Sequence, residues 1–147
     1  MITSKEMTDQ QISAYLTNQP IRVKEILASV ESELCGAVVS FSGNVRSQDQ
    51  GKNILSLEYE IHPSSEEVLI RVVKEVCAKF EILYCTAVHR FGEIPIGESA
   101  LLIAVSAAHR QPALQACAQL VDEIKSQIPI WKHQVFSDGT SEWVNSA

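Results

Sequence analysis

The sequence is poor in glycine and proline and has no long apolar run. Of its 147 residues, six are glycine and five are proline, whereas 46 % are apolar and 20 % are charged. These proportions exclude collagen-like, low-complexity and disordered chains. The longest nearly apolar run, Ala100–Ala108, has nine residues, about half of the roughly 20 that are needed to cross a bilayer. At roughly 150 residues per domain, the sequence predicts a single globular domain over residues 1–147.

Positive charge is also scarce. Twelve Lys and Arg stand against eighteen Asp and Glu, which gives a net charge of −6. This balance excludes a basic face large enough to hold a nucleic acid by counterion release. The stretch Met1–Gln11 lacks the basic segment followed by an apolar segment that marks a secretory signal. We therefore expect a cytoplasmic protein that binds neither nucleic acid nor membrane.

Cysteine and histidine occur without the spacings that bind metals. No two of the four cysteines form a C-x-x-C pair, and each lies in an apolar stretch, which predicts small buried thiols in a reducing compartment: Cys35, Cys77, Cys85 and Cys117. The four histidines have no i, i+4 pairing and no cysteine at ligand spacing. Phosphate-loop, dinucleotide and nucleophile-elbow motifs are absent as well. We expect neither a metal site nor a bound cofactor.

Hydrophobic periodicity in the first half of the chain predicts three strands and two helices. A period of two predicts an edge strand over 12–17, and helical spacing from Arg22 predicts a helix that stops near Cys35-Gly36. The β-branched run from Gly36 predicts a buried strand, joined through a polar loop to a strand over 54–61 as a hairpin. Ser64 and Glu67 then have capping-box spacing ahead of a helical stripe.

The second half repeats this alternation. Strands over 82–91 and 100–107 are predicted to form a second hairpin. A helix with Pro112 as its first residue runs up to Pro129, and a strand over 130–136 and a short strand over 142–144 follow. The predicted fold class is α+β, with helices packed on a mostly antiparallel sheet.

Five cationic or titratable residues lie at the ends of these predicted elements: Arg46, His109, Arg110, Lys125 and Lys132. Loops and element ends are where sites form. If these ends converge, they build an anion pocket, and a helix start beside His109 would add partial positive charge, so phosphate or carboxylate is the expected guest. The alternative is that each residue is a solvated surface charge.

The sequence gives a specific expectation for Lys125 and another for the pair His89-Arg90. Lys125 lies on the border of the predicted buried helix face, where partial desolvation suits an acid, a base or a nucleophile. The alternative is a side chain whose stem packs on the core and whose ammonium stays in water. His89-Arg90 lies inside a predicted strand, where we expect it to serve packing and a local carboxylate.

Six segments, in order and at normal spacings from about residue 11 onward, carry a resemblance to a known family. They are GAVVSFSGNVR (36–46), LEYEIH (57–62), VHRFGEIPIGE (88–98), AVSAAHRQPAL (104–114), DEIKSQIPIWKHQ (122–134) and DGTSEWV (138–144). The motifs F-x-G-x-V-R, H-R-x-G-x-x-x-x-G-E, S-x-x-H-R and K-x-x-x-P-x-W-K are specific when they occur together. The sequence resembles the large, catalytic subunit of molybdopterin synthase.

This resemblance implies an α/β hammerhead fold and a sulfurtransferase activity. The family inserts two sulfurs into cyclic pyranopterin monophosphate to form molybdopterin, the dithiolene that later binds molybdenum. The sulfur arrives as a thiocarboxylate on the C-terminal Gly-Gly tail of a small ubiquitin-like subunit. Large subunits form a homodimer, and one small subunit at each end completes a heterotetramer. Since the sulfur arrives this way, no cysteine is required, unlike in a persulfide sulfurtransferase.

The resemblance also implies roles for the candidate residues. Lys125 matches the lysine beside the terminal glycine of the small subunit, and Lys132 matches the second lysine of that pocket, so both are expected to be catalytic. Arg46, His109 and Arg110 match positions that bind the substrate phosphate, within one chain or across the dimer. Phe41 is expected to line the pocket, with core packing as the alternative explanation.

The sequence leaves open two alternative functions from other classes. One is a non-catalytic module that binds a ubiquitin-like Gly-Gly tail, and the other is a phosphate-ester enzyme. Some family members carry a further basic residue after the W-V pair. In this sequence Asn145, Ser146 and Ala147 follow that pair, so we expect that contribution to be missing or supplied elsewhere.

Overall fold

The computed structural model describes residues 9–145. Within that range the chain forms two β-sheets and three helices. Ser146 and Ala147, and the first eight residues of the Met1–Gln11 stretch, lie outside the described residues. No helix between residues 9 and 145 is long and apolar enough to cross a membrane.

A four-stranded sheet forms the centre of the molecule. Its strands lie in the order β1 (Gln11–Thr17), β5 (Tyr84–Arg90), β7 (Ser99–Ala107) and β2 (Ala37–Asn44). β5, β7 and β2 are antiparallel neighbours, and β1 runs parallel to β5. The hairpin predicted over 82–107 is therefore confirmed, and β1 and β2 form the two edges of the sheet.

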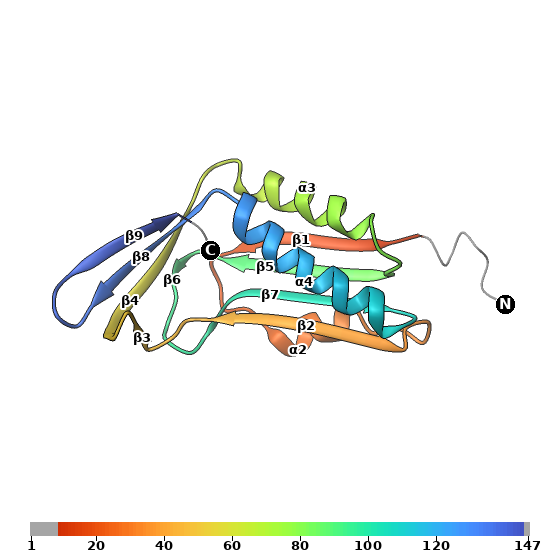
Figure 1. The fold of residues 1–147 in the computed structure, drawn as a ribbon, viewed down its shortest axis with the longest axis horizontal. Helices are drawn as coiled ribbons and strands as arrows, with labels where there is room; N and C mark the ends of the chain where they lie inside the picture. Colours follow the sequence, from red (N-terminus) through yellow and green to blue (C-terminus); the bar gives the residue numbers. More distant parts are fainter. Residues whose placement is uncertain (1–8, 146–147) are drawn as a thin grey trace.

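A second, antiparallel sheet projects from one end of the first (Figure 1). Its main strands are β4 (Lys52–Ile61), β8 (Ile130–Phe136) and β9 (Ser141–Asn145). The short strands β3 (Gln48–Asp49) and β6 (Gly92–Glu93) pair with β4. Since β6 follows β5 directly, the turn after β5 ties the two sheets together.

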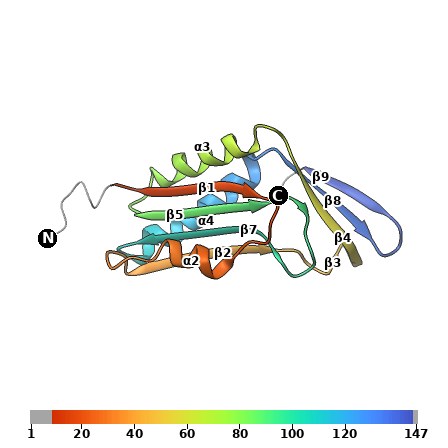
Figure 2. The ribbon, with the colours of Figure 1, turned by 180° about the vertical axis from the view of Figure 1, so that it is seen from behind.

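Two helices cover one face of the four-stranded sheet. α3 (Ser65–Cys77) and α4 (Arg110–Gln127) lie next to each other on the face toward the viewer in Figure 1. The shorter α2 (Val23–Ser29) lies on the opposite face (Figure 2). Both long helices turn an apolar stripe into the core, as their periodicity predicts: Leu69, Val72, Val73, Val76, Ala116, Leu120 and Ile124 are buried. The predicted α+β class, with helices on mostly antiparallel strands, is confirmed.

The predicted hairpin between the strands that begin near Gly36 and Ile54 is wrong. β2 pairs with β7, and β4 pairs with β8 in the other sheet. Alternating hydrophobicity indicates that a segment is a strand but does not select its partner, and the polar connection carries the chain from one sheet to the next. β2 is also an edge strand rather than a buried one, since Val38 keeps 47 % of its surface exposed.

Two predicted helix ends and one predicted cap also differ. α2 ends at Ser29 instead of near Cys35, because the Ser32 hydroxyl accepts a hydrogen bond from the Leu34 amide and forms a local turn. α3 forms as predicted, but without a capping box, since the Ser64 hydroxyl contacts the His62 ring instead. α4 begins at Arg110, which makes Pro112 its third residue rather than its first.

Candidate active site

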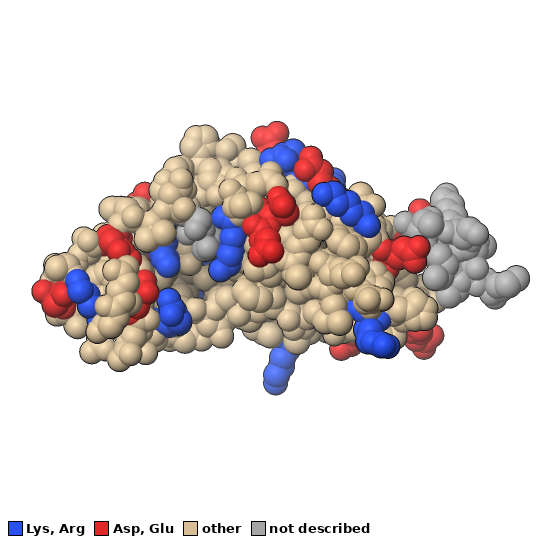
Figure 3. Space-filling model, in the orientation of Figure 1, with Lys and Arg blue, Asp and Glu red and all other residues tan. Residues whose placement is uncertain are grey.

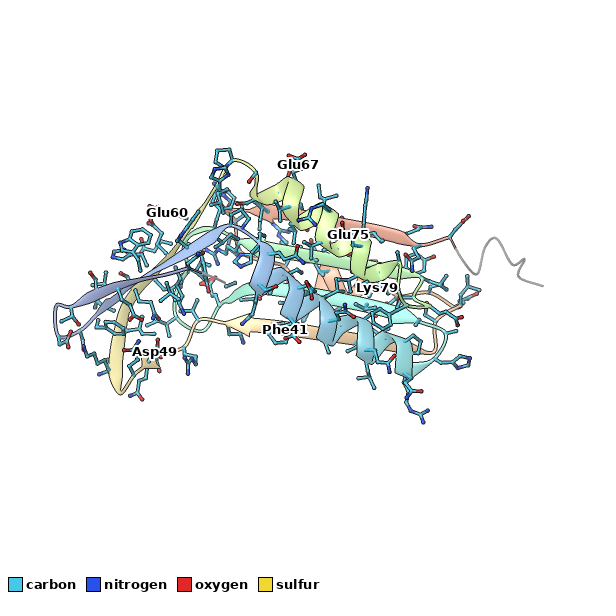
Figure 4. All side chains as sticks on the ribbon, turned by 45° about the horizontal axis from the view of Figure 1, so that its top comes forward. Phe41, Asp49, Glu60, Glu67, Glu75 and Lys79 are labelled. Atoms are coloured by element: carbon cyan, nitrogen blue, oxygen red, sulfur yellow. The ribbon has the colours of Figure 1, made fainter. Side chains whose placement is uncertain are left out.

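The end of α4 places an ammonium group over an aromatic ring. Lys125 lies in the last turn of α4, next to the fully buried Ile124, and is itself half-buried. Its Nζ is 5.9 Å from the centre of the Phe41 ring on β2, within the range of cation–π attraction. Figure 4 shows Phe41 beside this helix. The helical stripe correctly predicts that Lys125 lies at the border of the core.

Gly43 makes room for the Phe41 ring. A Cβ atom at position 43 would lie 3.3 Å from a ring atom of Phe41 and 3.9 Å from Cβ of Leu101. Residues 41 and 43 share one face of β2, since side chains alternate along a strand. The F-x-G motif therefore has a steric reason: the ring lies over the backbone of a residue that has no side chain.

Lys132 comes to the same end of the molecule through a sharp change of chain direction. α4 ends two residues before Pro129, and β8 begins directly after it. The proline cannot continue the helix, because it has no amide hydrogen and its ring clashes with the preceding turn. Lys132 then pairs with Tyr59 on the neighbouring strand β4.

A buried histidine, His89, contacts the cross-strand partner of Lys132 and is affected by the charge of Lys125. The His89 ring on β5 meets the Tyr59 ring edge-on, with 5.1 Å between their centres. The Lys125 ammonium is close enough to act on the charge of His89. Since Tyr59 is the cross-strand partner of Lys132, the two lysines approach one cluster from two different elements.

Arg46 lies beside this cluster and is bound to an acidic neighbour. Its Nη2 is 3.3 Å from Oδ1 of Asp49, and its side chain is 72 % exposed. Gln134 donates a hydrogen bond of 2.9 Å to the other oxygen of Asp49. That hydrogen bond is the main cause that lowers the pKa of Asp49, and the charges of Arg46 and Lys132 lower it further, while burial opposes them. Arg46 and Lys132 thus act on the same carboxylate.

His109 and Arg110 lie at the other end of α4. Both are exposed, His109 as the last extended residue before the helix and Arg110 as its first residue. Fifteen residues of helix separate Arg110 from Lys125, which is roughly 22 Å at 1.5 Å per residue. The structure therefore brings Phe41, Lys125 and Lys132 to one end of a single chain, with Arg46 beside them, and leaves His109 and Arg110 apart.

Charge on this face is mixed. Figure 3 shows several Lys and Arg side chains over the end where α4 meets the second sheet, with acidic side chains next to them. Among residues 9–145, no group of three His, Cys, Asp or Glu side chains is arranged to hold a metal ion. The Lys and Arg side chains at this end suit an anionic guest.

The family model described as MoaE protein matches residues 16–127. The chain belongs to the MoaE family. The resemblance stated from the sequence motifs is thereby confirmed. The match includes Phe41, Arg46, His109, Arg110 and Lys125, and ends five residues before Lys132.

Relatives of this MoaE chain come from distant organisms. It is 36 % identical to the molybdopterin synthase catalytic subunit of Rattus norvegicus over 128 residues, which are 86 % of this chain and 64 % of the rat protein. It is 36 % identical to the protein of the same name from Bacillus subtilis over 130 residues, 88 % of this chain and 82 % of the relative. The chain thus spans less than two thirds of the rat protein.

A solved structure agrees with the fold. The crystal structure of molybdopterin synthase from Staphylococcus aureus superposes with a TM-score of 0.82 at 34 % identity, covering 89 % of this chain and 96 % of that chain. At that coverage, both sheets and the long helices of the MoaE chain have counterparts in a known structure.

The H-R pair inside β5 has two different environments in this MoaE chain. Arg90 is buried and its Nη1 is 3.0 Å from Oε1 of Glu98, which confirms the predicted local carboxylate. His89 is fully buried, and its Nδ1 is 2.8 Å from the Arg90 carbonyl oxygen. Burial is the main cause that lowers the pKa of His89 to about 4, the charge of Lys125 adds to it, and the hydrogen bond to the Arg90 carbonyl opposes it. The imidazole is therefore neutral near pH 7.

The cysteines of the MoaE chain are free, and three of them are buried. A hydrogen bond with Cys77 and then burial raise the pKa of the Cys85 thiol well above its ordinary value. Burial raises the pKa of Cys117 to about 11. A reactive cysteine needs the opposite shift, because the thiolate is the nucleophile. The predicted buried thiols are confirmed for these three, and Cys35 is partly exposed.

Two residues of this cluster do not stand out in the sequence. Tyr59 occupies one position in an alternating strand, and Asp49, which lies in β3, falls in a stretch that the sequence predicts as a polar loop. For Tyr59 the available signal is the alternation along β4, which places it on the inner face together with Leu57 and Ile61. For Asp49 the sequence holds no signal, since its partners Arg46 and Gln134 meet it only in the folded chain.

Proposed function

We propose that the chain is the catalytic subunit of a molybdopterin synthase, a cytoplasmic sulfurtransferase of molybdenum cofactor biosynthesis that consists of one domain. It transfers sulfur from the thiocarboxylated C-terminus of a small ubiquitin-like subunit to cyclic pyranopterin monophosphate. The observation that carries this proposal is the Lys125 ammonium held 5.9 Å over Phe41, at the end where β8 brings Lys132. The names of the relatives from rat and Bacillus subtilis support it.

The two lysines suit this chemistry because both reactants are anions. Attack of the thiocarboxylate sulfur on the pterin side chain develops negative charge on a leaving oxygen. A fixed ammonium in a partly desolvated site stabilises that charge and can deliver a proton, which contributes on the order of 10²–10⁴-fold. Lys125 lies beside the terminal glycine of the tail in this proposal, and Lys132 acts as the second cation of the pocket.

Arg46 is the phosphate ligand that one chain supplies. In its ion pair with Asp49 the Arg46 side chain is 72 % exposed, while the Asp49 side chain is 20 % exposed and keeps its hydrogen bond from Gln134. An ion pair whose cation is solvated contributes about 0–1 kcal/mol. A cyclic phosphate carries one negative charge, as a carboxylate does, and its two non-bridging oxygens can accept two parallel hydrogen bonds from a guanidinium. Substrate can therefore replace Asp49 at little cost. Phe41 lines the pocket between this phosphate site and Lys125.

His109 and Arg110 reach the pocket from a second copy of the chain. β2 is a free edge of the four-stranded sheet, and an exposed edge offers unpaired backbone groups to another strand. The start of β2 lies beside the residues before His109, since a Cβ on Gly36 would be 2.7 Å from the Ala108 carbonyl oxygen. Phe41 lies past the middle of β2, toward its other end. Antiparallel pairing of two β2 strands about a two-fold axis reverses these ends and brings His109 and Arg110 of one copy toward Lys125 of the other.

Reconstitution tests the proposed function. The chain is mixed with a small subunit that carries the thiocarboxylate and with cyclic pyranopterin monophosphate, and the product is identified by mass. We expect two oxygens of the precursor side chain to be replaced by sulfur. The matched control is the same small subunit with an ordinary carboxylate, which has the same shape but no sulfur to give. A tight complex without any sulfur-containing product would instead indicate a non-catalytic binding module.

A further inference from the structure

His89 is one of three residues among 9–145 whose buried side-chain polar atom has no hydrogen-bond partner, the others being Arg90 and Ser106. His89 has no exposed surface, and its Nε2 has no hydrogen-bond partner among residues 9–145. Buried polar atoms without partners are rare. Such an atom has lost its hydrogen bonds to water and gained none in return, which lowers the free energy of unfolding. A fully apolar ring would fill the same space without that cost, so the nitrogen itself requires a reason.

One hydrogen bond fixes which form of the imidazole is present. The Arg90 carbonyl oxygen can only accept, so Nδ1 of His89 must carry the hydrogen and donate it over 2.8 Å. The ring is neutral, so Nε2 then has a lone pair and no hydrogen. Nε2 is also the ring nitrogen farther from the backbone, so it lies at the tip of the side chain. His89 therefore presents a single, fixed acceptor.

The sheet register places His89 in the row of the sheet that carries Gly43, over which the Phe41 ring lies. His89 pairs with Leu101, and Leu101 pairs with Gly43, so the three form one row across β5, β7 and β2. Phe41 leans over Gly43 on the same face, and the Lys125 ammonium lies over Phe41. Tyr59 closes the row from the second sheet, edge-on to the His89 ring.

The chemistry of the site selects the group that this acceptor binds. An acceptor cannot bond to a thiocarboxylate or a phosphate, which are acceptors themselves. Among the charged donors of residues 9–145, the Lys125 ammonium is the one whose charge lowers the pKa of His89 in the free chain. Among residues 9–145, no hydrogen bond or ion pair holds that ammonium, which lies over the Phe41 ring, a contact with little directionality. A lysine on a flexible stem needs a directional partner to be held at one point.

We propose that His89 is a positioning residue: its Nε2 accepts a hydrogen bond from the Lys125 ammonium when the tail of the sulfur-carrying subunit occupies the pocket. This inference rests on the proposed function. An ammonium has three N–H groups, so it can bond to His89 and still donate to the anionic tail. A neutral imidazole serves this purpose better than a carboxylate, which would cancel the charge that attracts two anionic reactants.

A set of variants tests this role in single-turnover assays with the thiocarboxylated complex. His89→Phe keeps the ring and removes the acceptor, and His89→Gln keeps an acceptor. We expect turnover in His89→Phe to fall at least about tenfold, because displacement of a reacting group by an ångström can cost about 10²-fold, while KM is unchanged. We expect His89→Gln to recover part of the loss. In a Lys125→Ala background, His89→Phe has no further effect.

Ser106→Ala is the matched control. Ser106 is also fully buried with an unpartnered side-chain oxygen, but it lies on β7 three residues beyond Ile103, which shares the core face with Leu101. Residues an odd number of positions apart on a strand face opposite sides, so Ser106 faces away from the pocket. We expect normal turnover in this variant. A loss equal to that of His89→Phe would mean that any buried polar atom matters, and it would overturn the proposal.

Nitrogen NMR of the His89 imidazole gives a readout that does not depend on turnover. The protein is bound to the small subunit in its inactive carboxylate form. We expect the Nε2 signal to shift on complex formation, as an acceptor nitrogen does when it gains a hydrogen bond, and to remain unshifted in Lys125→Met. An unshifted signal in the wild-type complex contradicts the proposal. Failure of the wild-type protein to form product contradicts the proposed function instead, so the two failures are distinct.

Discussion

Among single residues, Arg46 and Lys125 are expected to have different roles, Arg46 in substrate binding and Lys125 in the chemical step. The Arg46 guanidinium is exposed and is held only by an i, i+3 ion pair, so its removal costs the fold little. Lys125, in contrast, is held at the border of the core by the helix that carries it and by the ring beneath it. The two cations are therefore expected to differ in what they contribute: one binds the phosphate, and the other acts at the reacting atoms.

Arg46→Ala is expected to weaken binding of the pterin precursor by about 10–100-fold, since a charge-assisted contact contributes roughly 1.5–3 kcal/mol. Calorimetric titration of the precursor measures this. The control is Arg22→Ala, because Arg22 forms a similar exposed i, i+3 pair with Glu25 on α2. Arg22→Ala should bind the precursor normally. Equal affinities for all three proteins would remove Arg46 from the phosphate site.

Because of His89, the free energy of unfolding is expected to depend on pH. The pKa of His89 is lowered to about 4 in the folded chain, against about 6.5 in the unfolded chain. Between these values the unfolded chain binds a proton that the folded chain does not, so the free energy of unfolding falls as pH decreases. From pH 7 to pH 5, this contribution is about 2 kcal/mol.

Urea unfolding at pH 7 and pH 5, on the wild-type protein and on His89→Phe, measures that contribution. The wild-type protein should lose about 2 kcal/mol more than the variant over this interval. Because both proteins have the same acidic groups, the contribution of those groups to the change in unfolding free energy cancels when the two losses are compared. If both proteins lose the same free energy, His89 is not held neutral by burial.

At the scale of elements, the sequence predicts segments better than it predicts their partners. The helical stripe of α3 and the strands β5 and β7 follow from periodicity alone, because each depends on local spacing. The pairing of β2 with β7 does not, since it is decided by which apolar faces meet after the chain has passed through the polar connection.

The same distinction applies to the candidate site. The border position of Lys125 could be predicted from the stripe through Val121, Ile124 and Ile128, which is a property of one helix. The ion pair of Arg46 with Asp49 and the row from His89 to Gly43 could not. They need the sheet register, which depends on contacts between residues far apart in the sequence.

Charged substitutions at the free edge of β2 are expected to prevent the chain from forming a dimer. The double variant Val38→Lys, Ser40→Lys places charges on the exposed face of the edge strand, where two copies would meet with like charges close together. We expect a folded monomer in sedimentation experiments, with a melting curve close to that of the wild-type protein. A dimer of unchanged stability would place the interface elsewhere.

In the whole molecule, the proposed function assigns Lys125 and Arg110 to one site, and the length of α4 then requires two chains. Lys125 and Arg110 lie at opposite ends of this helix, roughly 22 Å apart by helix rise, too far for one chain to bring both to a small substrate. A dimer that joins the two ends has two sites, and each takes Lys125 from one copy and Arg110 from the other.

Mixed dimers test this arrangement. Lys125→Ala and Arg110→Ala are each expected to be nearly inactive at low substrate concentration. When the two variants are unfolded together and refolded, half of the dimers are mixed, and one of the two sites in each mixed dimer is intact. About a quarter of the wild-type activity should return. If no activity returns although mixed dimers form, both residues serve the same chain and the cross-dimer site is wrong.

In the proposed function, Lys125 takes part in the transfer of sulfur. The most direct measurement is single-turnover formation of the sulfur-containing product by the preformed complex with the thiocarboxylated subunit, for the wild-type protein, Lys125→Ala and Lys125→Arg, with a melting curve for each. Turnover in Lys125→Ala should fall by roughly 10²-fold or more, the range for loss of a positioned proton donor. Lys125→Arg should recover little, because a guanidinium keeps the charge but does not give up its proton. Near-normal turnover in a well-folded Lys125→Ala complex would contradict the claim and assign the chemistry to Lys132.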